Sequence, residues 1–134
     1  MSPEPDLHRL TLKIKAWARG LGFQQAGITD TSLDTAERYL QRWLDRGHHG
    51  DMGYMARHGT KRSRPMELEP GTLRIISLRM DYRPEEILSP DATLNDPKRA
   101  YISRYALGRD YHKLMRKRLQ RLAQQIESEA GPIK

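Results

Sequence analysis

Apolar side chains recur every three or four residues in three segments of the chain, and this period constrains the fold more than any other feature. It places the apolar residues of each segment on one helical face, and so predicts helices over residues 7–21, 33–46 and 110–129. We expect the first two helices to be core elements. The three apolar faces comprise Leu7, Leu10, Ile14, Trp17 and Leu21; Leu33, Ala36, Leu40, Trp43 and Leu44; and Tyr111, Leu114, Met115, Leu119, Leu122 and Ile126.

Short apolar runs between the helices predict the strands of a small sheet. We expect strands at residues 22–29 and 73–80, and a strand or strand end at 101–105. Residues 81–97 contain three prolines and five acidic residues, so we expect a mobile surface loop there. The pattern indicates an α/β (α+β) fold, in which helices pack on a small mixed sheet that forms part of a larger domain.

The composition excludes several classes of protein. The 134 residues contain no cysteine, so disulfides, thiol catalysis and cysteine-bound metal centres are absent from this segment. No apolar run approaches the roughly 20 residues that a membrane span needs. The first six residues are acidic and contain prolines, unlike a secretory signal peptide. We therefore expect a cytoplasmic protein with no membrane partner.

Positive charge is concentrated in one part of the chain. The net charge of the chain is +7. The stretch from Lys98 to Arg121 has nine Lys or Arg and only Asp110 as an acid, so its own net charge exceeds that of the whole chain. A local excess of this kind favours a polyanionic partner such as nucleic acid, although a solvated basic helix would show the same pattern.

Two further segments suggest sites. Residues 48–70 form a glycine-rich loop with His48, His49 and His58, but their spacing matches no zinc pattern, so we predict no metal site.

Residues 101–112 interleave aromatic rings with arginines. This composition suits stacking on bases or on a flat macrocycle, and a structural strand–turn–helix junction is the alternative.

Arg118 falls within the apolar face of the last helix, where an unpaired charge is costly. We expect it either to extend to solvent or to meet an anion or carboxylate at the edge of a cleft.

Several of these segments, taken together, resemble the N-terminal region of epoxyqueuosine reductases. The resemblance extends over nearly the whole chain and is most specific at residues 102–113. The matching segments are Gly53-Tyr54-Met55 with Arg57-His58, Arg62-Ser63-Arg64-Pro65, Leu68 to Met80, and Ile102-Ser103-Arg104-Tyr105-Ala106-Leu107-Gly108-Arg109-Asp110-Tyr111-His112-Lys113.

The resemblance implies a tRNA-modifying oxidoreductase that reduces epoxyqueuosine to queuosine at the wobble position, the last step of queuosine biosynthesis. The family uses cobalamin and two 4Fe–4S clusters, and the clusters lie in a following ferredoxin-like domain that these 134 residues do not include. Residues 1–134 would be the N-terminal part of the cobalamin- and tRNA-binding domain. The partner would be tRNA carrying epoxyqueuosine, the parent enzyme a monomer, and its electron donor is not indicated.

The resemblance also implies roles for particular residues. Arg62 and Ser103 would bind cobalamin, and together with the basic helix after Gly108 they would line one concavity. Weaker candidates for contact with the tRNA are Arg104, Tyr105, Arg109, Lys113, Arg116 and Lys117. The catalytic acid of the family is an aspartate that we expect beyond Lys134, so no catalytic residue is predicted in this chain, and the fragment alone should be inactive.

Two other classes of function remain open from the residues alone. One is a non-catalytic RNA-binding module that uses the basic stretch of residues 98–121. The other is a corrinoid protein that acts on small molecules, which would share the cofactor but would need no basic helix.

Overall fold

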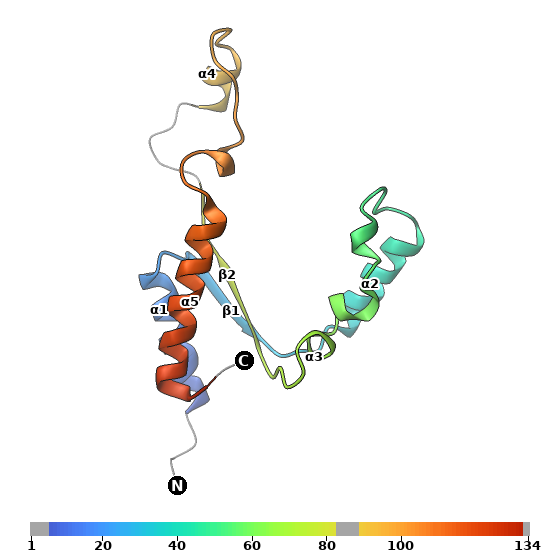
Figure 1. The fold of residues 1–134 in the computed structure, drawn as a ribbon, viewed down its shortest axis with the longest axis vertical. Coiled ribbons are helices and arrows are strands. Elements are labelled where there is room, and N and C mark those ends of the chain that lie inside the picture. The colour runs from blue at the N-terminus through green and yellow to red at the C-terminus, as the bar shows by residue number, and fades with distance from the viewer. Residues whose placement is uncertain (1–5, 83–88, 133–134) are drawn as a thin grey trace. The chain divides into compact units, whose positions relative to one another are not determined.

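The computed structural model describes residues 6–82 and 89–132, which form helices and one small sheet (Figure 1). Contacts divide the chain into a first unit, residues 1–26 and 78–133, and a second unit, which contains residues 27–77. Within the described ranges, no helix is long and apolar enough to cross a bilayer. The elements are α1 (Leu7–Gly20), β1 (Gln25–Thr29), α2 (Asp34–Asp45), η1 (Gly53–Met55), η2 (Gly59–Arg62), α3 (Pro65–Leu68), β2 (Ile75–Arg79), α4 (Pro90–Leu94), η3 (Arg104–Ala106) and α5 (Tyr111–Ala130).

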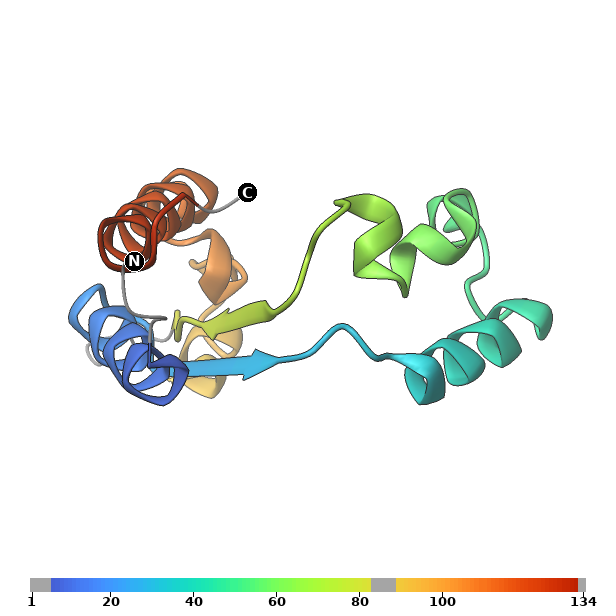
Figure 2. The same ribbon diagram turned by 90° about the horizontal axis from the view of Figure 1, so that it is seen from below.

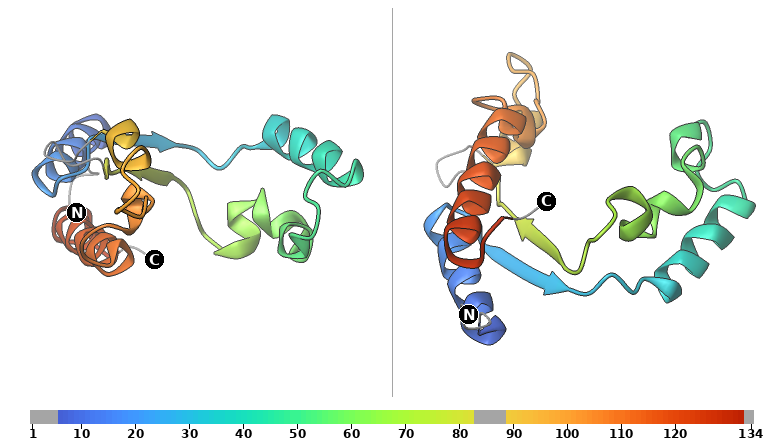
Figure 3. Two further views of the ribbon diagram at one scale, coloured as in Figure 1. Left: turned by 90° about the horizontal axis from the view of Figure 1, so that it is seen from above. Right: turned by 60° about the horizontal axis from the view of Figure 1, so that its bottom comes forward.

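The first unit is held together by the packing of α1 against α5, which lie side by side in Figures 2 and 3. The side chain of Asp6 caps α1 by accepting hydrogen bonds from the amides of His8 and Arg9. An ion pair between Lys13 and Glu129 joins the two helices at the surface. The buried apolar side chains of this unit are Ile14, Ala18, Phe23, Leu122 and Ile126.

The buried face of α5 is narrower than the sequence predicts. Leu114 and Leu119 were expected to be buried, but they are 41% and 43% exposed. Of the buried and half-buried positions of α5, Tyr111, Met115, Arg118, Leu122 and Ile126 fall within about 80° of one another at 100° per residue, and the half-buried Ala123 lies to one side of them. Since the core contact of α5 is with α1, this stripe forms most of the covered face, and the two leucines flank it.

Arg118 belongs to the buried stripe and has a partner that the sequence did not predict. Its Nη1 donates a hydrogen bond to the carbonyl of Gly22 at 3.3 Å and lies 3.0 Å from the sulfur of Met80. Gly22 has a φ of 86°, and a Cβ built on it would lie 2.7 Å from Arg118 Nη1. Among the described residues, a backbone carbonyl and a thioether are thus the partners of this half-buried guanidinium, and it forms no ion pair with a carboxylate.

The sheet consists of β1 and β2, which run antiparallel (Figure 2). The Gln24 amide donates to the Arg79 carbonyl at 2.9 Å, and the Gln24 side chain accepts from the Asp81 amide at 2.7 Å. The predicted strands at 22–29 and 73–80 are confirmed, although each is shorter. The predicted α/β class is confirmed as well.

Two local predictions are wrong. Residues 101–105 form no strand, because the carbonyls of Ser103 and Arg104 accept hydrogen bonds from Ala106 and Leu107 and close the 3-10 turn η3 instead. Part of the expected loop at 81–97 is the helix α4, which Ser89 caps through its Oγ and which Pro90 begins. Residues 83–88 of that loop lie outside the described residues.

The second unit contains no buried hydrophobic side chain among the described residues; Ser63, which is 8% exposed, is its buried residue. The prediction that α2 is a core helix is therefore wrong. Ala36 is exposed, and the other apolar residues of that face, Leu33, Leu40, Trp43 and Leu44, are only half-buried.

Polar interactions fix this second unit. Arg64 donates to both carboxylate oxygens of Glu37, at 2.8 and 3.0 Å, and to Glu67 at 3.0 Å. Ser63 Oγ donates to Glu37 at 2.7 Å, and Thr60 Oγ1 donates to Glu67 at 2.6 Å. These bonds tie α2 to η2 and α3. The bonds from Arg64 and Ser63 lower the pKa of Glu37 from 4.5 to about 2, and those from Thr60 and Arg64 lower the pKa of Glu67.

We predict that replacing Leu122 by Ala lowers the free energy of unfolding of the first unit by about 2–5 kcal/mol, because Leu122 is 2% exposed. Leu119→Ala is the matched control and should cost about 0.5–1 kcal/mol, because this leucine is 43% exposed. Urea unfolding followed by circular dichroism measures both values. Equal losses in the two variants would contradict the assigned face of α5.

We predict that the second unit loosens in acid. Because folding lowers the pKa of Glu37, the carboxylate contributes stability that is complete above its ordinary pKa of 4.5 and is lost as the pH falls through that value towards about 2. The fluorescence of Trp43 in a Trp17→Phe background should report this change. Glu37→Gln should remove much of the dependence on pH, and Glu69→Gln, at an exposed position, should leave it unchanged.

Candidate functional site

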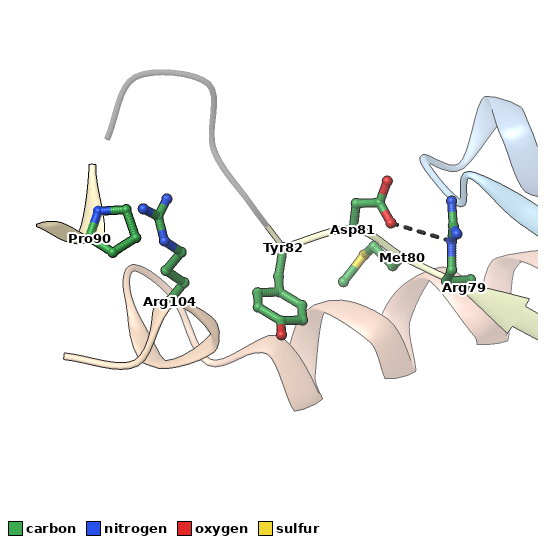
Figure 4. Close-up of a pocket in the computed structure, with 6 residues that line it drawn as sticks. All are labelled: Arg79, Met80, Asp81, Tyr82, Pro90 and Arg104. Carbon is green, nitrogen blue, oxygen red and sulfur yellow. Dashed lines mark ion pairs between the residues drawn. The ribbon is translucent and has the colours of Figure 1, made fainter. Parts of the chain in front are cut away.

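A cavity of about 750 Å³ lies in the first unit, between the end of β2, the start of α4 and η3. Figure 4 shows Arg79 and Asp81 facing each other at one end, where Arg79 Nε lies 3.3 Å from Asp81 Oδ1. Pro90 and Arg104 lie at the other end (Figure 4). The lining residues are Arg79, Met80, Asp81, Tyr82, Pro90 and Arg104.

A second cavity, of about 350 Å³, shares Met80 and Tyr82 with the first. Its other lining residues are Tyr105, Tyr111 and Met115. The rings of Tyr105 and Tyr111 meet edge to face, with centroids 6.0 Å apart and planes at 85°. Three tyrosine rings and two thioethers form a surface suited to a flat, polarisable ligand.

Asp110 fixes the start of α5 beside these cavities. Its carboxylate accepts from the His112 amide and lies 3.0 Å from His112 Nδ1. The hydrogen bond from the amide and the contact with the ring lower the pKa of Asp110. The His112 ring in turn stacks on Tyr111, with centroids 4.0 Å apart. This cap therefore positions the Tyr111 ring that lines the second cavity.

The structure brings some of the predicted site residues together. Arg104, which is half-buried, lines the first cavity, and Tyr105 lines the second. Ser103 is exposed directly before η3, and Arg109 is exposed just before the cap of α5. The predicted tRNA residues of α5, which are Lys113, Arg116 and Lys117, are all exposed.

Arg62 lies in the second unit, where it has a local structural role. Its Nε donates to the Met55 carbonyl at 3.1 Å, and its Nη2 donates to the Tyr54 carbonyl at 2.7 Å. These bonds hold η1 against η2. Arg62 and Ser103 belong to different units, so a concavity that they share stays a prediction.

Met80, Tyr82 and Pro90 line the cavities but were not identified as site residues from the sequence. The sequence feature that could have identified Met80 and Tyr82 is their position at or just after the end of a predicted strand, where binding residues are often found. For metals, no group of three or more suitable side chains is found in residues 6–82 and 89–132.

Comparisons with known proteins agree on one family. The family model described as "Epoxyqueuosine reductase QueG, DUF1730" matches residues 62–134. Proteins named epoxyqueuosine reductase from Pseudomonas aeruginosa, Salmonella typhimurium and Escherichia coli are 61%, 55% and 57% identical to the chain. The alignments cover 99%, 99% and 95% of the chain, but only 36%, 34% and 33% of those relatives. The chain thus spans about a third of their length. No solved structure matches the chain.

We predict that Asp110→Ala lowers the free energy of unfolding by about 1 kcal/mol, because the His112 amide loses its acceptor. Asp110→Asn is the control and should retain most of the stability, since an asparagine side chain also caps helices. Chemical denaturation monitored by circular dichroism distinguishes the two. An Ala variant with the same free energy of unfolding as the unaltered chain would show that this cap is dispensable.

Proposed function

Because the chain belongs to the epoxyqueuosine reductase QueG family, we propose that it is the N-terminal part of an enzyme that reduces epoxyqueuosine to queuosine in tRNA. The observation that carries the proposal is the family match over residues 62–134. That range includes every residue of the two cavities and all the predicted cofactor and tRNA residues.

The proposed reaction removes the oxygen of an epoxide and leaves an alkene. Two electrons and two protons enter, both carbon–oxygen bonds break, and the oxygen leaves as water. A positioned acid must protonate the departing oxygen. We expect this acid to be an aspartate outside the 134 residues. The ligands of the 4Fe–4S clusters would also lie outside them, because such clusters are held by cysteines.

The chemistry of the described residues is compatible with the proposed cofactor. Cobalamin would supply the reducing centre when bound. The aromatic and thioether surface of the second cavity suits a flat ring system, either a base or part of a macrocycle. Ser103 is small and exposed, so a planar group could approach its backbone closely. Arg62 would donate to an amide or phosphate oxygen of the cofactor while its bonds to residues 54 and 55 hold it in place.

The tRNA would be held by the basic side chains around α5. Arg104 and Tyr105 line the cavities, so they would contact the nucleotide that enters, whereas Arg109 would contact a neighbouring phosphate. Lys113, Arg116 and Lys117 are exposed along α5 and would contact the RNA backbone. We further propose a cytoplasmic, monomeric enzyme with an external electron donor. The relatives described above are named as reductases, so nothing favours the non-catalytic RNA-binding module.

We predict that the 134-residue chain alone does not convert epoxyqueuosine tRNA, whereas a chimera that joins it to the remaining two thirds of the Pseudomonas aeruginosa relative does. Mass spectrometry of digested tRNA measures the conversion. In the chimera, Ser103→Trp should abolish activity and cobalamin binding, since an indole would fill the space beside the cofactor.

Ser103→Ala in the same chimera is the matched control and should retain activity. Conversion by the isolated chain, or full activity of the Trp variant, would contradict the proposal. Binding of cobalamin, followed by its visible absorption, separates a cofactor defect from a loss of folding.

A further inference from the structure

Helix α2 and its C-cap carry three exposed arginines spaced four residues apart, Arg38 and Arg42 within the helix and Arg46 at the cap. At 100° per residue they fall within about 80° of one another and extend over about 12 Å of helix. We call these three residues the α2 arginine stripe. The stripe belongs to the second unit, whereas the basic residues of α5 belong to the first.

We propose that the α2 arginine stripe is a second RNA-binding surface, which contacts backbone phosphates of the tRNA separately from α5. This inference rests on the proposed function, because it takes tRNA as the partner, and it adds a contact surface that the family match does not assign. The match begins at residue 62, after α2 has ended.

Two of the three carboxylates of α2 have partners outside the stripe. Glu37 is held by Arg64 and Ser63, and Asp45 accepts a hydrogen bond from Gln41 at 2.8 Å. Asp34 lies in the first turn, where a negative charge is favourable near the helix N-terminus. Among the described residues, no ion pair involves any of the three arginines.

This arrangement is unfavourable for the isolated helix. Like charges four residues apart destabilise a helix by about 0.2–0.5 kcal/mol per pair, and the stripe contains two such pairs. An anionic partner along the same face removes that repulsion. Since backbone phosphates are regularly spaced anions, a row of guanidinium groups is well matched to them.

Tyr39 adds an aromatic group at the edge of the stripe. The Arg42 guanidinium lies over the Tyr39 ring, 4.7 Å from its centroid, and the tyrosine is 63% exposed. The cation–π contact restricts the Arg42 side chain before any ligand binds. An exposed ring beside phosphate-binding arginines also offers a stacking surface for an unpaired base, which favours RNA over an acidic peptide.

The test measures binding of the 134-residue chain to a fluorescein-labelled tRNA transcript at several salt concentrations. In the triple variant Arg38→Gln, Arg42→Gln, Arg46→Gln we expect affinity to fall about tenfold or more near 100 mM salt. The slope of log K against log salt should decrease by about 2–3, the value for the loss of three phosphate contacts. Glutamine retains good helix propensity, and circular dichroism checks that α2 is intact.

The matched control is Arg9→Gln, Arg19→Gln, Arg74→Gln, which removes the same charge from exposed positions elsewhere. It should change affinity by less than about threefold and leave the slope nearly unaltered. Tyr39→Leu should lower affinity about fivefold without changing the slope, because it removes a ring and no charge.

Three outcomes separate this inference from the proposed function. If the unaltered chain binds no tRNA, the tRNA-binding role of this region within the proposed function fails. If the chain binds tRNA and the α2 variant matches the control, the inference alone is overturned. If poly-glutamate binds the stripe more tightly than tRNA does, the stripe is a protein-binding surface, and the inference is again overturned. In every case where tRNA is the partner, binding should weaken in the triple variant of α5, Lys113→Gln, Arg116→Gln, Lys117→Gln.

Discussion

The contact between α1 and α5 is the interaction on which the packing of the first unit depends. Every buried hydrophobic side chain among the described residues belongs to these two helices or is Phe23, which follows α1. The start of α5, with the Tyr111 ring and the Asp110 cap, belongs to the same unit. The cavities lie among the residues that follow β2, the turn η3 and the start of α5, and binding residues are common on such connecting segments.

The two units are stabilised by different physical means. Burial of apolar surface supports the first, whereas hydrogen-bonded charges centred on Arg64 support the second. Exposed ion pairs contribute little individually, so a unit that relies on them has a small margin of stability. The bidentate pair of Arg64 with Glu37 is the strongest type of such contact. The segment from Gly27 to Ser77 should therefore respond to pH and salt more than the helical pair does.

The sequence predicted the long helices well, because their period is strong and Asp110 is a distinct cap. It failed where local hydrogen bonds outweighed strand propensity, as at Arg104, and where a short capped helix began at Pro90. It also placed Leu114 in the core, since the period does not reveal how much of a helix its neighbours cover. Within the site, Arg104 and Tyr105 were identified through a family resemblance, whereas Tyr82 lacked any comparable pattern.

The turn after α1 links two distant positions in the chain. Gly22 has a left-handed backbone conformation, and the space above its Cα is filled by the guanidinium of Arg118. A larger residue at position 22 would be strained by its φ and would displace that guanidinium. A shorter residue at position 118 would leave the Gly22 carbonyl without its donor. Positions 22 and 118 should consequently both tolerate little change, although they lie 96 residues apart in the sequence.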